Sequence, residues 1–109
     1  MSPLEYHVLL ALANGPLYGY AIKDAVAAES DGTLTPRAGS LYRVLARLMT
    51  ARLVAEVASA EESSPHPGLA RRYYALTTAG RRALTAEAHR LKRTAAVAEK
   101  RLGLAQGRS

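Results

Sequence analysis

Four arginines lie close together between Thr35 and Arg52 of this 109-residue chain, with no acidic residue among them. A guanidinium group offers five N–H donors in a planar fork, which suits oxygen-rich anions such as phosphate. A second basic segment, residues 71–101, holds nine basic residues and two acidic ones, whereas residues 1–34 and 53–70 each carry a net charge of −3. Because the overall charge of +6 is concentrated in two segments, it indicates a polyanionic partner.

The first basic segment also has the spacing of an amphipathic helix. Its apolar stripe contains Leu41, Val44, Leu45, Leu48 and Met49. The opposite side contains Pro36, Gly39, Ser40, Arg43 and Arg47. Such a helix fits the major groove of DNA, where its N-terminal residues meet base edges and its arginines meet phosphates. Arg37 is expected to reach only a phosphate, and Arg52 suits the negative end of the helix dipole. The alternative is a solvated surface helix.

Three helices, two strands and a long last helix are predicted to position these side chains. The helices are expected at 4–13, 17–29 and 35–51, the strands at 53–59 and 70–77, and the last helix from 77 or 78 to 102. Thr35 is the expected N-cap of the third helix, with Pro36 in its first position. A polar loop over 61–68 joins the two strands into a hairpin.

The base of this hairpin is also basic, because Arg71 and Arg72 directly follow the loop. Period-two alternation places Tyr74 and Leu76 on the core side, and Arg71 and Tyr73 outward. A basic third helix followed by a hairpin with a basic base is the winged helix-turn-helix arrangement, an α+β fold that is mainly α. The alternative is that the two arginines only keep a strand edge charged and solvated.

Three stretches carry a more specific pattern: GPLYGYAI at 15–22, TPRAGSLYRVLARLMTARLV at 35–54 and RRYYALTTAGRRAL at 71–84. In this order and spacing they resemble the PadR family of bacterial transcriptional regulators, in its short form with a single C-terminal helix. The resemblance implies a cytoplasmic, homodimeric repressor that binds an inverted repeat in double-stranded DNA.

Residue by residue, the resemblance implies DNA contact, or direct support of it, for Tyr18, Tyr20, Ser40, Tyr42, Arg72 and Tyr73. The helical wheel and the hairpin base add Arg43, Arg47 and Arg71. Tyr20 and Tyr42 each lie beside an apolar stripe, so a place mainly in the core is the alternative for both. The loop contains Glu61 and Glu62 and no basic residue, so the base of the wing, not its tip, is expected to touch the DNA backbone.

The last helix has apolar residues at alternating steps of four and three, the spacing of a coiled-coil seam. They are Leu84, Ala88, Leu91, Ala95, Ala98 and Leu102. This seam predicts dimerisation, with residues 1–76 as the DNA-binding domain and 77–109 as the dimerisation helix and a short tail. The alternative is a helix that lies back on its own domain. A two-fold dimer would place its two third helices about 34–36 Å apart, one turn of DNA.

Several classes of protein are disfavoured. The chain has no cysteine, and it has no apolar run of about 18 residues that would predict a membrane span. His7, His66 and His89 are isolated, so no metal site, cofactor or enzymatic activity is predicted. Two alternatives stay open: a repressor that also binds a small-molecule effector near Tyr6, Leu9, Leu10 and the last helix, and an adaptor whose long helix pairs with another protein.

Overall fold

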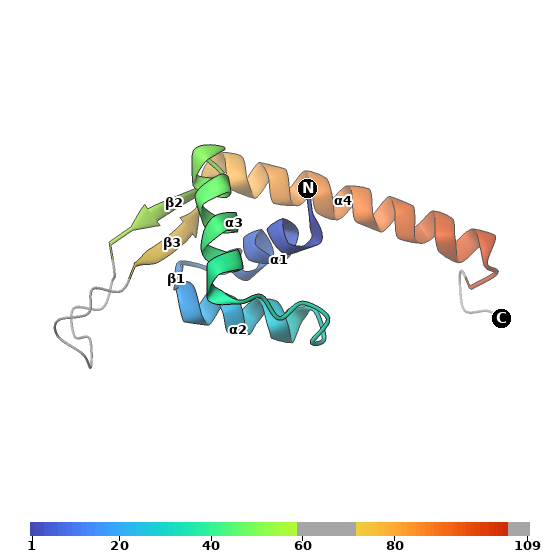
Figure 1. Cartoon of the computed structure of the whole chain (residues 1–109). Coiled ribbons are helices and arrows are strands. Elements are labelled where there is room, and N and C mark those ends of the chain that lie inside the picture. Colours follow the sequence, from blue (N-terminus) through green and yellow to red (C-terminus); the bar gives the residue numbers. More distant parts are fainter. Residues whose placement is uncertain (59–71, 105–109) are drawn as a thin grey trace.

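The computed structural model describes residues 1–58 and 72–104. Its elements in chain order are α1 (Pro3–Ala11), β1 (Leu17–Tyr18), α2 (Gly19–Glu29), α3 (Ala38–Thr50), β2 (Val54–Val57), β3 (Tyr73–Leu76) and α4 (Thr78–Arg101). In Figure 1, α1, α2 and α3 gather at the centre, β2 and β3 project to one side as the wing, and α4 runs away to the other. This is a winged helix-turn-helix with a long C-terminal helix, as predicted.

The apolar stripe of α3 faces the core, as its spacing predicted. Leu41, Val44, Leu45 and Leu48 are all buried, and Met49 is partly buried against them. They pack in one cluster with Leu9 of α1, Ile22 of α2 and Tyr74 of β3. Burying a large apolar side chain contributes about 1.5–3 kcal/mol. This burial therefore holds α3 in place by one face and leaves its basic face toward solvent.

A third strand completes the sheet. The predicted helix over 17–29 begins only at Gly19, because Leu17 and Tyr18 pair antiparallel with Tyr74 and Tyr73. The strand order is β1-β3-β2. Val54, the first residue of β2, pairs with Leu76, the last residue of β3. A two-residue strand is too short to show an alternating pattern in the sequence. Its effect is to fasten the start of α2 to the base of the wing.

The start of α3 also differs from the prediction. Arg37 is the N-cap, without a side-chain hydrogen bond, and the helix begins at Ala38 rather than at Pro36. The preceding segment stays outside the helix because Pro36 is buried and Leu34 packs against the core. Ser30 stabilises this segment, since its hydroxyl oxygen accepts a hydrogen bond from the Leu34 N–H at 2.9 Å. The N-terminal turn of α3 is therefore free of side-chain caps.

Hydrogen bonds tie the end of α3 to the start of α4, although the two helices are far apart in the sequence. Arg52 has a positive φ of 62°, and the Leu53 N–H donates to the Leu48 carbonyl at 2.9 Å, which closes the last turn. The Thr77 hydroxyl donates to the Arg52 carbonyl at 2.7 Å and accepts from the Gly80 N–H at 2.9 Å, so Thr77 is the N-cap of α4. The last helix therefore begins directly after Thr77, in agreement with its predicted start at 77 or 78.

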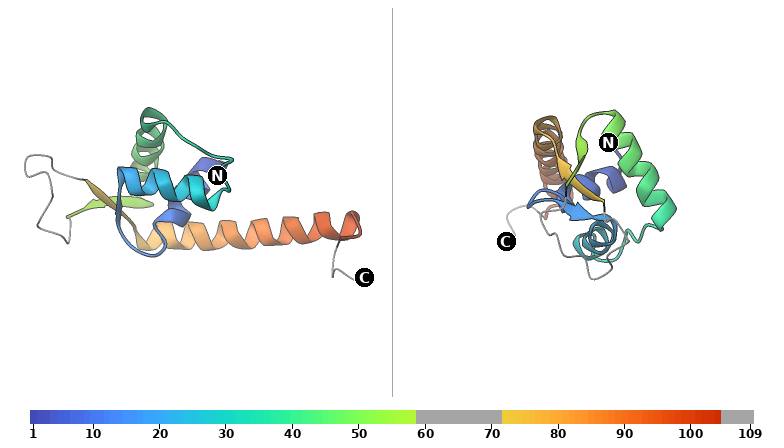
Figure 2. Two further views of the ribbon diagram at one scale, coloured as in Figure 1. Left: turned by 90° about the horizontal axis from the view of Figure 1, so that it is seen from below. Right: turned by 90° about the vertical axis from the view of Figure 1, so that its left-hand side faces the viewer.

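The first turns of α4 pack on the domain and the rest extends beyond it. α4 contacts α1, and Leu84 is part of the core. From His89 to Leu104 every residue is exposed. Figure 2 shows α3 and α4 on opposite sides of the molecule, with α1 between them. The basic face of α3 and the free part of α4 therefore occupy different faces.

Candidate nucleic-acid interface

The exposed side of α3 carries four of the nine residues predicted to bind DNA. Arg43 and Arg47 are exposed, Tyr42 is 48% exposed and Ser40 is partly exposed. Pro36, which the helical wheel placed on the same side, is buried instead, because it precedes the helix. Since α3 contains no acidic residue, its own side chains on this side are all cationic or neutral.

Arg43 lies over the N-terminal turn of α3. Its Nη2 donates a hydrogen bond to the Ser40 hydroxyl at 3.4 Å, and its Nη1 lies 3.8 Å from the position that a Cβ on Gly39 would occupy. Within residues 1–58 and 72–104, no carboxylate lies within ion-pair distance of this guanidinium group. Arg43 is therefore a cation whose charge is available to a ligand at the start of the helix.

Arg47 has a carboxylate partner that the sequence did not indicate. Its Nε lies 3.6 Å from Oε2 of Glu5 on α1, while its side chain stays 59% exposed. The pKa of Glu5 is lowered from its ordinary value, chiefly by the hydrogen bond from the Ser2 backbone. Burial opposes this effect, and the Ser2 hydroxyl and Arg47 each lower the pKa by a smaller amount. Glu5 is thus ionised at neutral pH, and Arg47 and Glu5 connect α3 to α1.

Tyr20 and Tyr42, for which a place mainly in the core was the alternative, both lie at the surface. Tyr20 is 70% exposed, and Tyr42 packs its hydroxyl against Gly19, where a Cβ would lie 2.3 Å from that oxygen. Gly19, Tyr20, Tyr42 and Lys23 line a small pocket of about 100 Å³ between the starts of α2 and α3. Lys23 was not among the predicted residues, although it lies one helical turn after Tyr20 and thus on the same side of α2.

The base of the wing is built around aromatic rings. The rings of Tyr18 and Tyr73 are 5.7 Å apart, and Tyr74 is buried with 2% of its surface exposed, as the alternation predicted. Burial raises the pKa of Tyr74, and the nearby Tyr42 and Glu56 raise it further, against a lowering effect of Arg72. The exposed Arg72 lies 3.9 Å from Glu56 through its Nε. Arg71, Glu61 and Glu62 lie outside the described residues.

The predicted seam of α4 is buried at one end only. Leu84 is 9% exposed and belongs to the core of its own domain, and Ala88 is partly buried. Ala95 and Ala98 are exposed, and Leu91 and Leu102 are 37% and 69% exposed. The C-terminal four residues of the seam therefore form an apolar strip on the surface of the isolated chain.

Within the described residues, no cluster of three or more histidine and acidic side chains suited to a metal ion occurs. None of the helices described combines the length and the apolar character needed to cross a membrane.

Sequence comparison places most of the chain in one family. Residues 8–86 match the model of the transcriptional regulator PadR-like family. A curated protein, an uncharacterised 37.1 kDa protein of a Streptomyces fradiae transposon, is 43% identical over 86 residues, which make up 79% of this chain. The chain spans only 22% of the length of that relative.

Solved structures agree with this family. A PadR family transcription regulator from Clostridium difficile superposes with a TM-score of 0.75 at 25% identity, covering 93% of this chain and 99% of that one. A PadR-like regulator from Bacillus cereus gives a TM-score of 0.75 at 22% identity, covering 96% and 93%. Bacillus subtilis PadR, solved in complex with operator DNA, gives 0.63 at 23% identity, covering 77% and 45%. The chain belongs to the PadR-like family of transcriptional regulators.

Proposed function

We propose that the protein is a homodimeric repressor that binds an inverted-repeat operator through α3 in the major groove and through the base of the wing on the DNA backbone. The observation that carries this proposal is the exposed side of α3, which presents Ser40, Tyr42 and Arg43 without any acidic residue. The solved complex of Bacillus subtilis PadR with operator DNA supports the same class of ligand for this chain.

The proposed division of labour on DNA follows from position. Ser40 and Arg43 lie in the first half of α3, where a helix in the major groove meets base edges. Tyr18, Tyr73 and Arg72 surround the base of the wing, where they suit contacts to phosphate oxygens. Tyr20, Tyr42 and Lys23 line the pocket between the starts of α2 and α3, where they suit further contacts to DNA. Arg71 completes the proposed backbone contacts from the wing.

The dimer is proposed to form through the exposed part of the α4 seam. Leu91, Ala95, Ala98 and Leu102 lie on one side of the helix, and small alanine side chains allow two helices to approach closely. In this division, residues 1–76 bind DNA and residues 77–109 hold the two copies together. A two-fold arrangement sets the two α3 helices about 34–36 Å apart, so each reads one half of the inverted repeat.

Arg43→Ala tests the assignment of α3. Full-length protein and a labelled duplex from the region upstream of its own gene are titrated by fluorescence anisotropy at several salt concentrations. The variant should bind about fivefold or more weakly, and its binding should depend less steeply on salt, because a phosphate or base contact is lost. The matched control is Arg93→Ala, an exposed arginine on the outer part of α4. Equal binding by both variants and the wild type would contradict the proposal.

A second candidate function is a ligand-responsive repressor. A pocket of about 250 Å³ between the start of α1 and α4 is lined by Tyr6, His7, Glu87, Arg90 and Leu91, with Met1, Ser2 and Pro3 at its edge. Tyr6 is among the residues predicted for an effector site, but Leu9 is fully buried and cannot line one. Thermal shift assays with a small-molecule library test this candidate, and stabilisation that Tyr6→Ala abolishes would support it.

A further inference from the structure

Two arginines of the proposed DNA-binding surface hold a carboxylate in the same way. Arg47 approaches Glu5 through Nε at 3.6 Å, and Arg72 approaches Glu56 through Nε at 3.9 Å. Nε is the guanidinium nitrogen nearest the side-chain stem. The two terminal nitrogens, Nη1 and Nη2, therefore remain as donors for a further anion. Arg43 differs, because no carboxylate of the described residues pairs with it.

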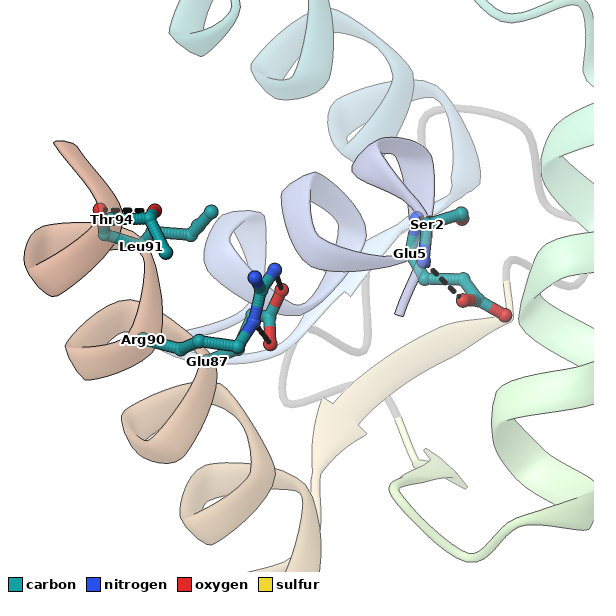
Figure 3. A network of polar contacts seen from close by, with 6 residues as sticks. All are labelled: Ser2, Glu5, Glu87, Arg90, Leu91 and Thr94. Carbon is teal, nitrogen blue, oxygen red and sulfur yellow. Dashed lines mark hydrogen bonds and ion pairs between the residues drawn. The ribbon is translucent and has the colours of Figure 1, made fainter. Parts of the chain in front are cut away.

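Glu5 is held much more firmly than Glu56. Its Oε1 accepts a hydrogen bond from the Ser2 N–H at 2.8 Å, and its own N–H donates to the Ser2 hydroxyl at 3.1 Å, which together form a capping box. The Glu5 side chain is 23% exposed, whereas that of Glu56 is 50% exposed. Figure 3 shows the Glu5 side chain pointing from the start of α1 toward the ribbon of α3. One carboxylate oxygen therefore caps α1 while the other faces Arg47.

We propose that Glu5 is a positioning residue that makes DNA binding through Arg47 selective. This inference rests on the proposed DNA-binding function and deepens it. A phosphate in the correct register meets the terminal nitrogens of Arg47 while Nε stays on Glu5. A phosphate in another register must either draw Arg47 away from Glu5 or approach the Glu5 carboxylate. Glu5 thus weakens binding to unmatched DNA more than binding to the operator.

Glu5→Gln tests this proposal, because glutamine also serves in a capping box and removes only the charge. Affinities of the full chain are measured for the duplex upstream of its own gene and for a scrambled duplex of equal length. The variant should bind the scrambled duplex about two- to fivefold more tightly, which corresponds to the energy of one exposed ion pair. Its affinity for the upstream duplex should increase by a smaller factor. The control is Glu29→Gln, an equal change of charge at the exposed end of α2, which should leave the ratio of affinities unchanged.

The same measurement in an Arg47→Ala background separates positioning from simple repulsion. There the gain from Glu5→Gln should disappear, whereas a gain that persists would show that Glu5 only repels phosphate and would overturn the proposal. The proposal would also be overturned if Glu5→Gln left the ratio of the affinities for the two duplexes unchanged, or if Glu29→Gln changed that ratio equally. Arg47→Lys gives a second test. Lysine has no Nε–H beside further terminal donors, so this variant should also lose selectivity. A wild-type protein that binds both duplexes equally would instead contradict the proposed function itself.

Discussion

At the scale of single residues, the glycine in the first turn of α4 has the least room for a side chain among the glycines described. A Cβ at Gly80 would lie 1.9 Å from the Leu53 carbonyl oxygen, which belongs to the backbone and cannot turn aside. The same carbonyl accepts a hydrogen bond from the Thr77 N–H at 3.1 Å. Only a residue without a side chain lets α4 start this close to the end of α3.

Gly80→Ala should therefore lower the free energy of unfolding by about 2–3 kcal/mol, because overpacking moves backbone that is hydrogen bonded. Denaturation by urea, followed by circular dichroism, measures the change. Gly39→Ala is the matched control: it lies within α3, and its nearest neighbour is the flexible Arg43 side chain at 3.8 Å. That change should stabilise the protein by about 0.5–1 kcal/mol. Equal stability of the two variants would contradict this account.

At the scale of elements, α1 depends on the charge of Glu5. The pKa of Glu5 is lowered in the folded chain, mainly by the Ser2 backbone hydrogen bond. A lowered pKa means that the ionised form stabilises the fold above the ordinary value of 4.5, and that this stabilisation is lost as the pH falls through the folded-state pKa. α1 also contacts both α3 and α4, so the effect reaches beyond one helix.

The wild type should exceed Glu5→Gln in free energy of unfolding by about 0.5–1 kcal/mol at pH 7, the range for a carboxylate at a helix N-terminus. This difference should shrink toward zero as the pH falls below the ordinary pKa of 4.5 and Glu5 binds a proton. Urea denaturation at a series of pH values measures it. A difference that stays constant with pH would contradict this account, because it would not depend on the charge of Glu5.

At the scale of the whole molecule, the chain is extended for its length. Its radius of gyration is 16.5 Å, compared with about 13 Å for a compact chain of this size. The difference arises from α4, whose outer part is exposed on every side in a single chain. An apolar strip containing Leu91 and Leu102 is thus left without cover, which favours association over a monomer.

Ala98→Glu should convert the proposed dimer to a monomer at micromolar concentration, because it buries a carboxylate without a partner in the seam. Ala96→Glu makes the same change about 160° away around α4, given 100° per residue, and should leave the dimer intact. Size-exclusion chromatography with light scattering gives the mass of each. A wild type that is itself a monomer would favour the alternative of an adaptor for a different protein.

Regular patterns let the sequence predict much of the fold. The apolar stripe of α3 repeats over several turns, and a long helical pattern follows residues 77 and 78, so the buried face of α3 and the start of α4 were predicted correctly. β1 is two residues long and has no pattern, and α3 starts late because the burial of Leu34 and Pro36 depends on tertiary packing. For the candidate site, the exposed arginines follow from periodicity. The partnership of Arg47 with Glu5 does not, because it joins helices that are far apart in the sequence.

Arg52, Thr77 and Gly80 form a joint that ties the start of α4 to the end of α3. A helix of 24 residues is about 36 Å long at 1.5 Å per residue. A tilt of about 5° at this joint would therefore move the far end of α4 by about 3 Å, close to the rise of one base pair. In a dimer held along α4, the stiffness of this joint would set how much variation in half-site spacing the protein tolerates.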